Sequence, residues 1–186
     1  MRLFTAIDLD DGTREAVARL QRRLAERPGG DQSLKWVDPS RMHLTLVFLG
    51  EVADARVPAI IEILSSPIDA PRFTIAFQGL GVFPPRGAPR VLWLDVAQGG
   101  AALATVHGHV VKRLESLGVA LDDRAFRPHL TLARWRDSRP SDRARALAGG
   151  VSEPIAVLGV DSIALYQSRL SSAGPTYTAL ARATLT

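Results

Sequence analysis

The chain contains no cysteine among its 186 residues, and this absence removes several classes of function. Without thiols there can be no disulfide, thiolate zinc site, iron–sulfur cluster or cysteine nucleophile. A chain of this size buries roughly 70% of the surface that its unfolded form exposes, so its core needs neither a disulfide nor a structural metal. Metal sites built from histidine and carboxylate remain open at this point.

Long apolar runs are also scarce. The longest uncharged run, 96–111, includes a glutamine, three glycines and two histidines, and it falls short of the ~20 apolar residues that a membrane-spanning helix needs. The opening residues reach Asp8 after only a short apolar stretch, which differs from the apolar segment of a signal peptide. We therefore predict a cytoplasmic protein with no membrane association.

Lysine is rare, with two residues against 21 arginines, and asparagine is absent. The net charge is +4, yet the window 124–145 alone holds seven arginines against two aspartates, a net of +5. Because the guanidinium fork matches phosphate oxygens, this window suggests an anionic partner. A generally arginine-rich composition with solvated side chains would give the same pattern.

Hydrophobic periodicity predicts a chain that alternates helices with pairs of strands. Asp10 or Asp11 caps a first helix that ends at Pro28-Gly29-Gly30, and helical spacing predicts three more, at 57–64, 101–116 and 142–148. Beyond an opening strand, strand patterns cover 34–37, 43–49, 73–80, 90–96, 129–134, 154–160, 162–167 and 176–183. Since the connections within pairs are short, antiparallel neighbours are favoured over a doubly wound sheet.

The string His-Leu-Thr-Leu occurs twice, at 43–46 and at 129–132. On a strand, His and Thr at positions i and i+2 point to one face while the leucines point into the core. If the two strands face each other in a duplicated fold, they line one cleft with two imidazoles and two hydroxyls. A single copy is more typical of a polar strand face, whereas two copies favour a shared catalytic cleft.

These side chains suit phosphoryl chemistry near neutral pH. A neutral imidazole of His43 or His129 can accept a proton while the other, protonated, donates one. The hydroxyls of Thr45 and Thr131 can donate to phosphate oxygens, and Arg134 can neutralise developing charge. Strict alternation would place Arg134 on the face opposite His129, so its participation requires a bulge, a turn or a strand end.

Other candidates are weaker. His107 and His109 sit at i and i+2 of a predicted helix, about 200° apart, so they cannot readily chelate a metal, and His107 should be partly buried. Phe48 is the best candidate for stacking on a base, although it too needs a deviation from alternation to reach the His43 face.

The motifs resemble those of the 2H phosphoesterases, which carry two His-x-Thr-x motifs, and in particular the bacterial and archaeal RNA 2′,3′-cyclic phosphodiesterases, also known as 2′-5′ RNA ligases. The resemblance covers nearly the entire chain. It rests on the opening strand, both motif strands, the middle of the chain and the closing strands, at 3–7, 35–50, 80–84, 89–93, 126–134 and 165–177.

The resemblance implies a bilobal α+β fold, pseudo-symmetric by duplication, with two antiparallel sheets flanking a central cleft and helices outside. We expect one domain over 1–186 made of two intertwined lobes. It also implies metal-independent hydrolysis of a terminal 2′,3′-cyclic phosphate to a 2′-phosphomonoester, with 2′-5′ ligation as a side activity. By the same resemblance His43 and His129 are catalytic, while Thr45, Thr131 and Arg134 bind the substrate phosphate.

We expect no metal, no cofactor and no obligate protein partner, and a monomer that acts on RNA ends or small nucleotides. Two rival interpretations share the same residues. One is a non-catalytic module that binds RNA ends or nucleotides, and the other is a sister 2H enzyme that acts on another cyclic or 2′-5′ linked nucleotide. The near-symmetry of the motifs leaves open which histidine is the acid.

Overall fold

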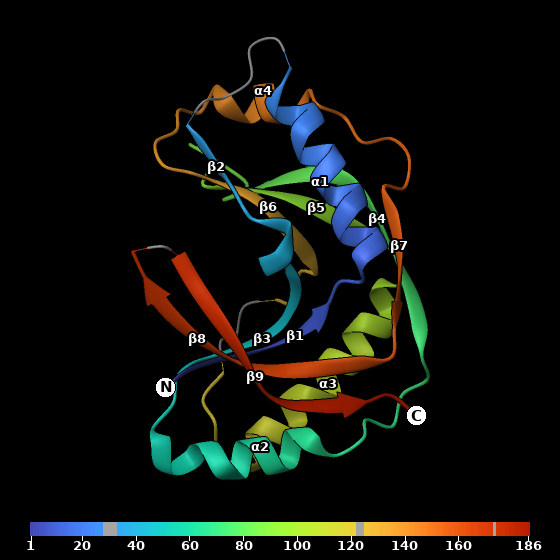
Figure 1. The fold of residues 1–186 in the computed structure, drawn as a ribbon, viewed down its shortest axis with the longest axis vertical. Coiled ribbons are helices and arrows are strands. Elements are labelled where there is room, and N and C mark those ends of the chain that lie inside the picture. The colour runs from blue at the N-terminus through green and yellow to red at the C-terminus, as the bar shows by residue number, and fades with distance from the viewer. Residues whose placement is uncertain (28–32, 122–124, 173) are drawn as a thin grey trace.

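The computed structural model describes residues 1–27, 33–121, 125–172 and 174–186. Nine strands form two antiparallel sheets in this part of the chain (Figure 1). The four-stranded sheet has the order β3 (His43–Glu51), β1 (Arg2–Asp8), β8 (Ser162–Ser171), β9 (Gly174–Thr184). The five-stranded sheet has the order β2 (Leu34–Trp36), β6 (His129–Trp135), β5 (Val91–Gln98), β4 (Phe73–Phe83), β7 (Ala156–Val160).

In the described ranges, four α-helices and two 3-10 turns connect these strands. The α-helices are α1 (Asp11–Ala25), α2 (Val57–Ser65), α3 (Gly100–Ser116) and α4 (Asp142–Leu147), and the 3-10 turns are η1 (Pro39–Arg41) and η2 (Asp54–Arg56). Asp10 caps α1, since its carboxylate accepts a hydrogen bond from the Thr13 amide at 2.7 Å. The predicted stop of this helix at Pro28-Gly29-Gly30 lies outside the described residues.

The sheets interleave the two ends of the chain. The first, third, eighth and ninth strands form one sheet, so β1 lies between β3 and β8, which is far away in sequence. The predicted mixed α+β class with two antiparallel sheets is confirmed. Each sheet therefore depends on pairings that short-range patterns do not specify, and one motif strand belongs to each sheet.

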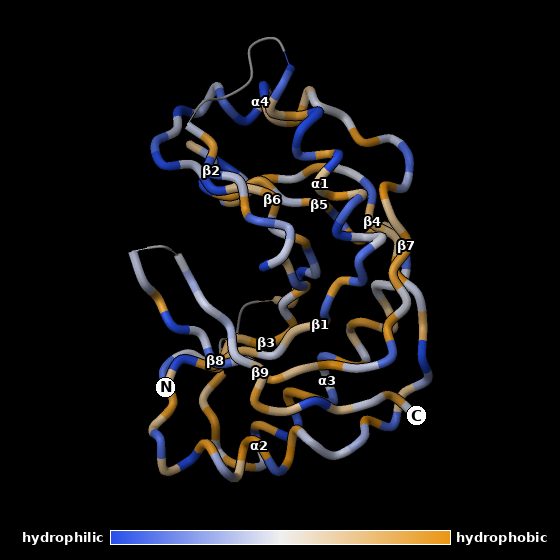
Figure 2. Tube along the Cα trace, in the orientation of Figure 1, coloured by the Kyte–Doolittle hydropathy of each residue, from blue (hydrophilic) through white to orange (hydrophobic). Residues whose placement is uncertain are grey.

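Amphipathic helices close the core. α2 buries Val57, Ile60 and Leu64, and hydrophobic and hydrophilic segments alternate along it (Figure 2). α3 buries Leu103, Val106, Val110 and Leu114, at the predicted spacing. No helix in the described ranges has the length and hydropathy needed to span a bilayer.

The two motif strands have the same burial pattern. Along both, the His and Thr are partly exposed and the two leucines are buried. The predicted alternation is confirmed, and each sheet presents one imidazole and one hydroxyl on a single face.

Candidate active site

Each motif histidine stands at the first residue of its strand and is oriented by a backbone carbonyl two residues earlier. The His43 Nδ1 lies 3.0 Å from the Arg41 carbonyl oxygen, and the His129 Nδ1 lies 2.7 Å from that of Arg127. Because a carbonyl oxygen only accepts, Nδ1 carries the proton in both rings. Each Nε2 is therefore the nitrogen that remains free of this contact and can accept or donate a proton.

A β-bulge follows the threonine in both motif strands. Thr45 pairs with Ala6 while Val47 pairs with Thr5, so Leu46 is an extra residue in β3. In β6 the extra residue is Leu132, between the residues that pair with Trp93 and Leu92. In each strand two consecutive residues are buried at this point, after which the alternation resumes one step out of phase.

This change of phase brings the fifth residue after each histidine onto the histidine's face. Phe48 and Arg134, which strict alternation would point away, are both exposed on the side of His43 and His129 respectively. The deviation that the sequence required for both residues is thus present. Phe48 is 53% exposed, with its ring centroid 6.2 Å from that of Phe4.

Buried polar side chains satisfy the backbone at both bulges. The Thr5 hydroxyl accepts from the Val47 amide at 3.2 Å. In the other sheet the Gln21 amide group donates to the Leu132 carbonyl at 3.0 Å and to the Val37 carbonyl at 2.8 Å. Both side chains are buried, and unpaired backbone groups there would be costly, so these contacts hold the bulges that orient Phe48 and Arg134.

Aromatic rings surround His43. Its ring stacks on Phe4 with centroids 4.7 Å apart and meets the edge of Tyr177 at 5.0 Å. Tyr166 also stacks on Phe4, at 5.4 Å, and its ring centroid lies 6.5 Å from that of His43. The four-stranded sheet therefore gives its histidine a largely apolar wall.

The surroundings of His129 are also aromatic but less enclosed. Phe83 meets it edge-on at 5.0 Å, and Trp93 lies 5.9 Å away. The Trp93 ring lies flat over Gly81, where any Cβ would approach it to 2.1 Å, so only glycine allows this arrangement.

The two motif strands come close to each other. Residues of β3 and β6 have Cα atoms within 8 Å. Arg134, on the five-stranded sheet, acts electrostatically on the Tyr177 phenol, which belongs to the four-stranded sheet and touches His43. We call this region, defined by His43, Thr45, His129, Thr131 and Arg134, the inter-sheet site.

Burial lowers the pKa of both motif histidines below their ordinary value of 6.5. A carboxylate opposes this effect in each case: Asp8 is the register neighbour of His43, and Asp95 that of His129. Arg134 lowers the pKa of His129 further. Both rings therefore favour the neutral form, with a carboxylate near enough to support the protonated one.

Asp8 is itself held by two hydrogen bonds. The Tyr166 hydroxyl and the Arg182 guanidinium each donate to it at 2.6 Å. Burial, followed by the contact with Asp8, raises the pKa of Tyr166 to about 12, so this phenol stays protonated and keeps donating. The Asp95 carboxylate accepts a hydrogen bond from the adjacent Val96 amide at 2.9 Å.

Sequence reasoning missed several residues at this site. Tyr177, Asp8 and Asp95 reach it through strand pairing with distant segments, and no local motif marks them. His107, by contrast, is half-buried as predicted, and its ring stacks on Phe126 at 4.2 Å.

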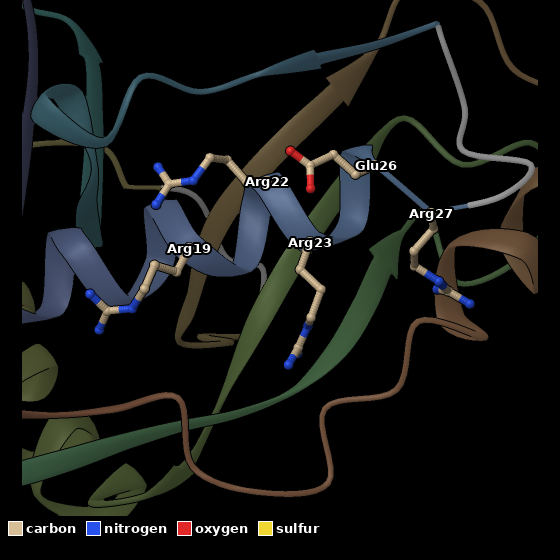
Figure 3. Close-up of a pocket in the computed structure, with 5 residues that line it drawn as sticks. All are labelled: Arg19, Arg22, Arg23, Glu26 and Arg27. Atoms are coloured by element: carbon tan, nitrogen blue, oxygen red, sulfur yellow. The ribbon is translucent and has the colours of Figure 1, made fainter.

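The predicted basic window contributes to the site through Arg134. Arg143 instead donates to the Pro84 and Gly87 carbonyls, and Arg145 faces Asp142 at 3.4 Å. A separate shallow depression lies on α1, lined by four arginines and one glutamate (Figure 3): Arg19, Arg22, Arg23, Glu26 and Arg27. None of these residues belongs to a motif strand.

Comparison with known proteins identifies the family. A model described as the 2′-5′ RNA ligase superfamily matches residues 9–171. The chain belongs to this superfamily. The predicted resemblance is confirmed, and with it the assignment to a family of 2H phosphoesterase enzymes.

Relatives in this superfamily cover nearly the whole chain. A protein of Archaeoglobus fulgidus named RNA 2′,3′-cyclic phosphodiesterase is 37% identical over 179 residues, which are 95% of this chain and 96% of that protein. A protein of the same name from Thermus thermophilus is 33% identical, and the match covers 100% of this chain and 90% of that protein.

Solved structures agree with these sequence matches. The structure of Escherichia coli LigT complexed with 3′-AMP has a TM-score of 0.76 and 27% identity, covering 100% of this chain and 98% of LigT. The structure of TT0787 of Thermus thermophilus has a TM-score of 0.75 and 30% identity, and the match covers 99% of this chain and 97% of TT0787. The LigT complex shows that a relative with this fold binds a nucleotide.

Proposed function

We propose that this chain hydrolyses the terminal 2′,3′-cyclic phosphate of RNA or of a nucleoside to a 2′-phosphomonoester. The observation that carries the proposal is the pair of equally oriented imidazoles, each with Nδ1 held by a carbonyl and Nε2 left for proton transfer. The names of the relatives, which match nearly the full chain, support the same reaction.

In the proposed reaction the oxygen of a water molecule attacks phosphorus while one histidine takes a proton from that water. The other, protonated, gives its proton to O3′ as the bond between phosphorus and O3′ breaks, which leaves a 2′-phosphate and a free 3′-hydroxyl. Because burial lowers the pKa of both imidazoles below 6.5, the state with one neutral and one protonated ring is most populated below pH 6.5.

The remaining site residues stabilise the phosphate. Thr45 and Thr131 donate hydroxyl hydrogen bonds to non-bridging oxygens, and Arg134 neutralises the charge that develops on them. Phe48 stacks on the terminal base from the opposite sheet. The mechanism calls for no metal or cofactor, because imidazoles transfer both protons.

If the 5′-hydroxyl of a second RNA replaces water, the same bond changes give a 2′-5′ linkage. We therefore include reversible 2′-5′ ligation as a side activity. We propose a cytoplasmic, monomeric enzyme that acts on RNA ends or small nucleotides.

Hydrolysis assays with nucleoside 2′,3′-cyclic phosphates, cyclic dinucleotides and 2′-5′ linked dinucleotides test the proposal. Turnover of the first class to a 2′-phosphate supports it. Turnover confined to the other substrates identifies a sister enzyme, and binding of nucleoside 2′-phosphates without any turnover identifies a binding module.

A further inference from the structure

A second cation lies beside Arg134 on the motif face of the five-stranded sheet. Lys35, on the edge strand β2, is directly opposite Arg134 in the register of β2 with β6. Directly opposed residues of an antiparallel pair project to the same face, with Cβ atoms roughly 5 Å apart. Both side chains are exposed, so Lys35 shares the face that carries His129, Thr131 and Arg134.

This placement has a cost that an anion would offset. Like charges directly opposite each other destabilise a sheet, and within the described residues neither Lys35 nor Arg134 forms an ion pair. Two cations side by side, with exposed donors, form an attractive site for a phosphate.

The position along the strand separates this pair from the reacting centre. Arg134 is the fifth residue after His129, and one of these five is the extra residue of the bulge. Four regular steps of about 3.3 Å place the Cα atoms of His129 and Arg134 roughly 13 Å apart. Arg134 is long enough to reach back toward His129, on whose pKa it acts. Lys35, shorter and anchored on the next strand, is better placed for a neighbouring phosphate.

We propose that Lys35 and Arg134 together form a subsite for the phosphodiester that joins the terminal nucleotide to the preceding one. The inference rests on the proposed function and sharpens its substrate class: the preferred substrate is the end of an RNA chain rather than a free nucleoside cyclic phosphate. Arg134 lies between the two phosphates and contacts both, whereas Lys35 contacts the phosphodiester alone.

A structural role for Lys35 makes a different prediction. A lysine on an edge strand also deters pairing with other sheets. That role depends on the exposed charge of Lys35, so it predicts that a substitution has the same effect on short and long substrates.

The test compares two substrates with one variant. For a dinucleotide that ends in a 2′,3′-cyclic phosphate, Lys35→Met should lower kcat/KM about tenfold, mainly by raising KM. For the corresponding nucleoside 2′,3′-cyclic phosphate, the same variant should change kcat/KM by less than about twofold. The slope of log(kcat/KM) against log[salt] for the dinucleotide should become shallower by about 0.7. Lys35→Arg should restore most of the loss.

The chain offers a matched control, since Lys112 is its other lysine and is exposed on α3. Lys112→Met should change neither substrate. An equal loss on both substrates would assign Lys35 to the cyclic phosphate, and no loss on either would leave it an edge residue; each outcome overturns the subsite. Failure of the wild-type protein to hydrolyse either substrate would instead refute the proposed function.

Discussion

The two motif strands share a backbone and differ in their side chains. Both begin with a histidine whose Nδ1 meets a carbonyl two residues earlier, and both bulge at the leucine after the threonine. At the fifth position after the histidine, however, one strand carries Phe48 and the other Arg134. His43 is also enclosed by Phe4 and Tyr177, whereas Arg134 acts electrostatically on His129.

This difference indicates a division of labour. In the proposed mechanism the two proton-transfer groups are equivalent, because the repeated backbone fixes both rings in the same way. The flanking positions give one face apolar character suited to a base and the other positive charge suited to phosphate. Under the proposed function, the two motif strands can thus bind an asymmetric substrate between two similarly oriented imidazoles.

The largest effect should come from removing either imidazole. His43→Ala and His129→Ala should each lower kcat about 10²-fold or more, since each ring performs one proton transfer. Steady-state kinetics with a nucleoside 2′,3′-cyclic phosphate measure this, with His109→Ala as the control. If one variant kept near-normal turnover, the two strands would not be functionally equivalent.

The pH dependence should be a bell centred below pH 6.5. The base must be neutral and the acid protonated, and burial lowers both pKa values below 6.5. Activity therefore rises with pH through the lower macroscopic pKa and falls through the higher one, about tenfold per unit on each limb. A profile of kcat/KM, which reports the free enzyme, checks this; an optimum above pH 7 would contradict it.

Substitutions at the fifth positions should separate the two faces. Arg134→Met should lower kcat/KM roughly 10- to 100-fold, in line with the loss of a charged hydrogen bond, and flatten its salt dependence. Phe48→Ala should raise KM about tenfold by loss of stacking, with little change in salt dependence. Equal salt responses in the two variants would argue against the division of labour.

The smallest effects should come from the threonines. Thr45→Val and Thr131→Val each remove one neutral hydroxyl donor and should lower kcat/KM roughly 2- to 12-fold. The matched change Thr105→Val, on an exposed face of α3, should leave kinetics unchanged. A wild-type rate in both motif variants would remove the hydroxyls from the site.

The sequence predicted the elements well because the relevant patterns are local. Alternation of His43, Leu44, Thr45 and Leu46 identified both the strand and its outward face, and Asp10 was one of two proposed caps for α1. The amphipathic spacing of α3 likewise predicted its buried residues.

The bulges and the partners of the histidines could not be predicted in this way. The His-Leu-Thr-Leu string is the same with or without an extra residue, and the bulges are supported by Thr5 and Gln21 from other elements. The sequence showed only that Arg134 and Phe48 needed such a deviation. Tyr177 and Asp95 reach the histidines through pairings set by the whole fold.

The most direct test of the central claim is hydrolysis of a nucleoside 2′,3′-cyclic phosphate in excess chelator, with the product phosphate located by NMR. The two-histidine mechanism predicts a 2′-phosphate formed at a rate that the chelator does not change. Turnover abolished by the chelator would contradict it, because a metal would then take part. A 3′-phosphate product would mean that the bond to O2′ breaks instead.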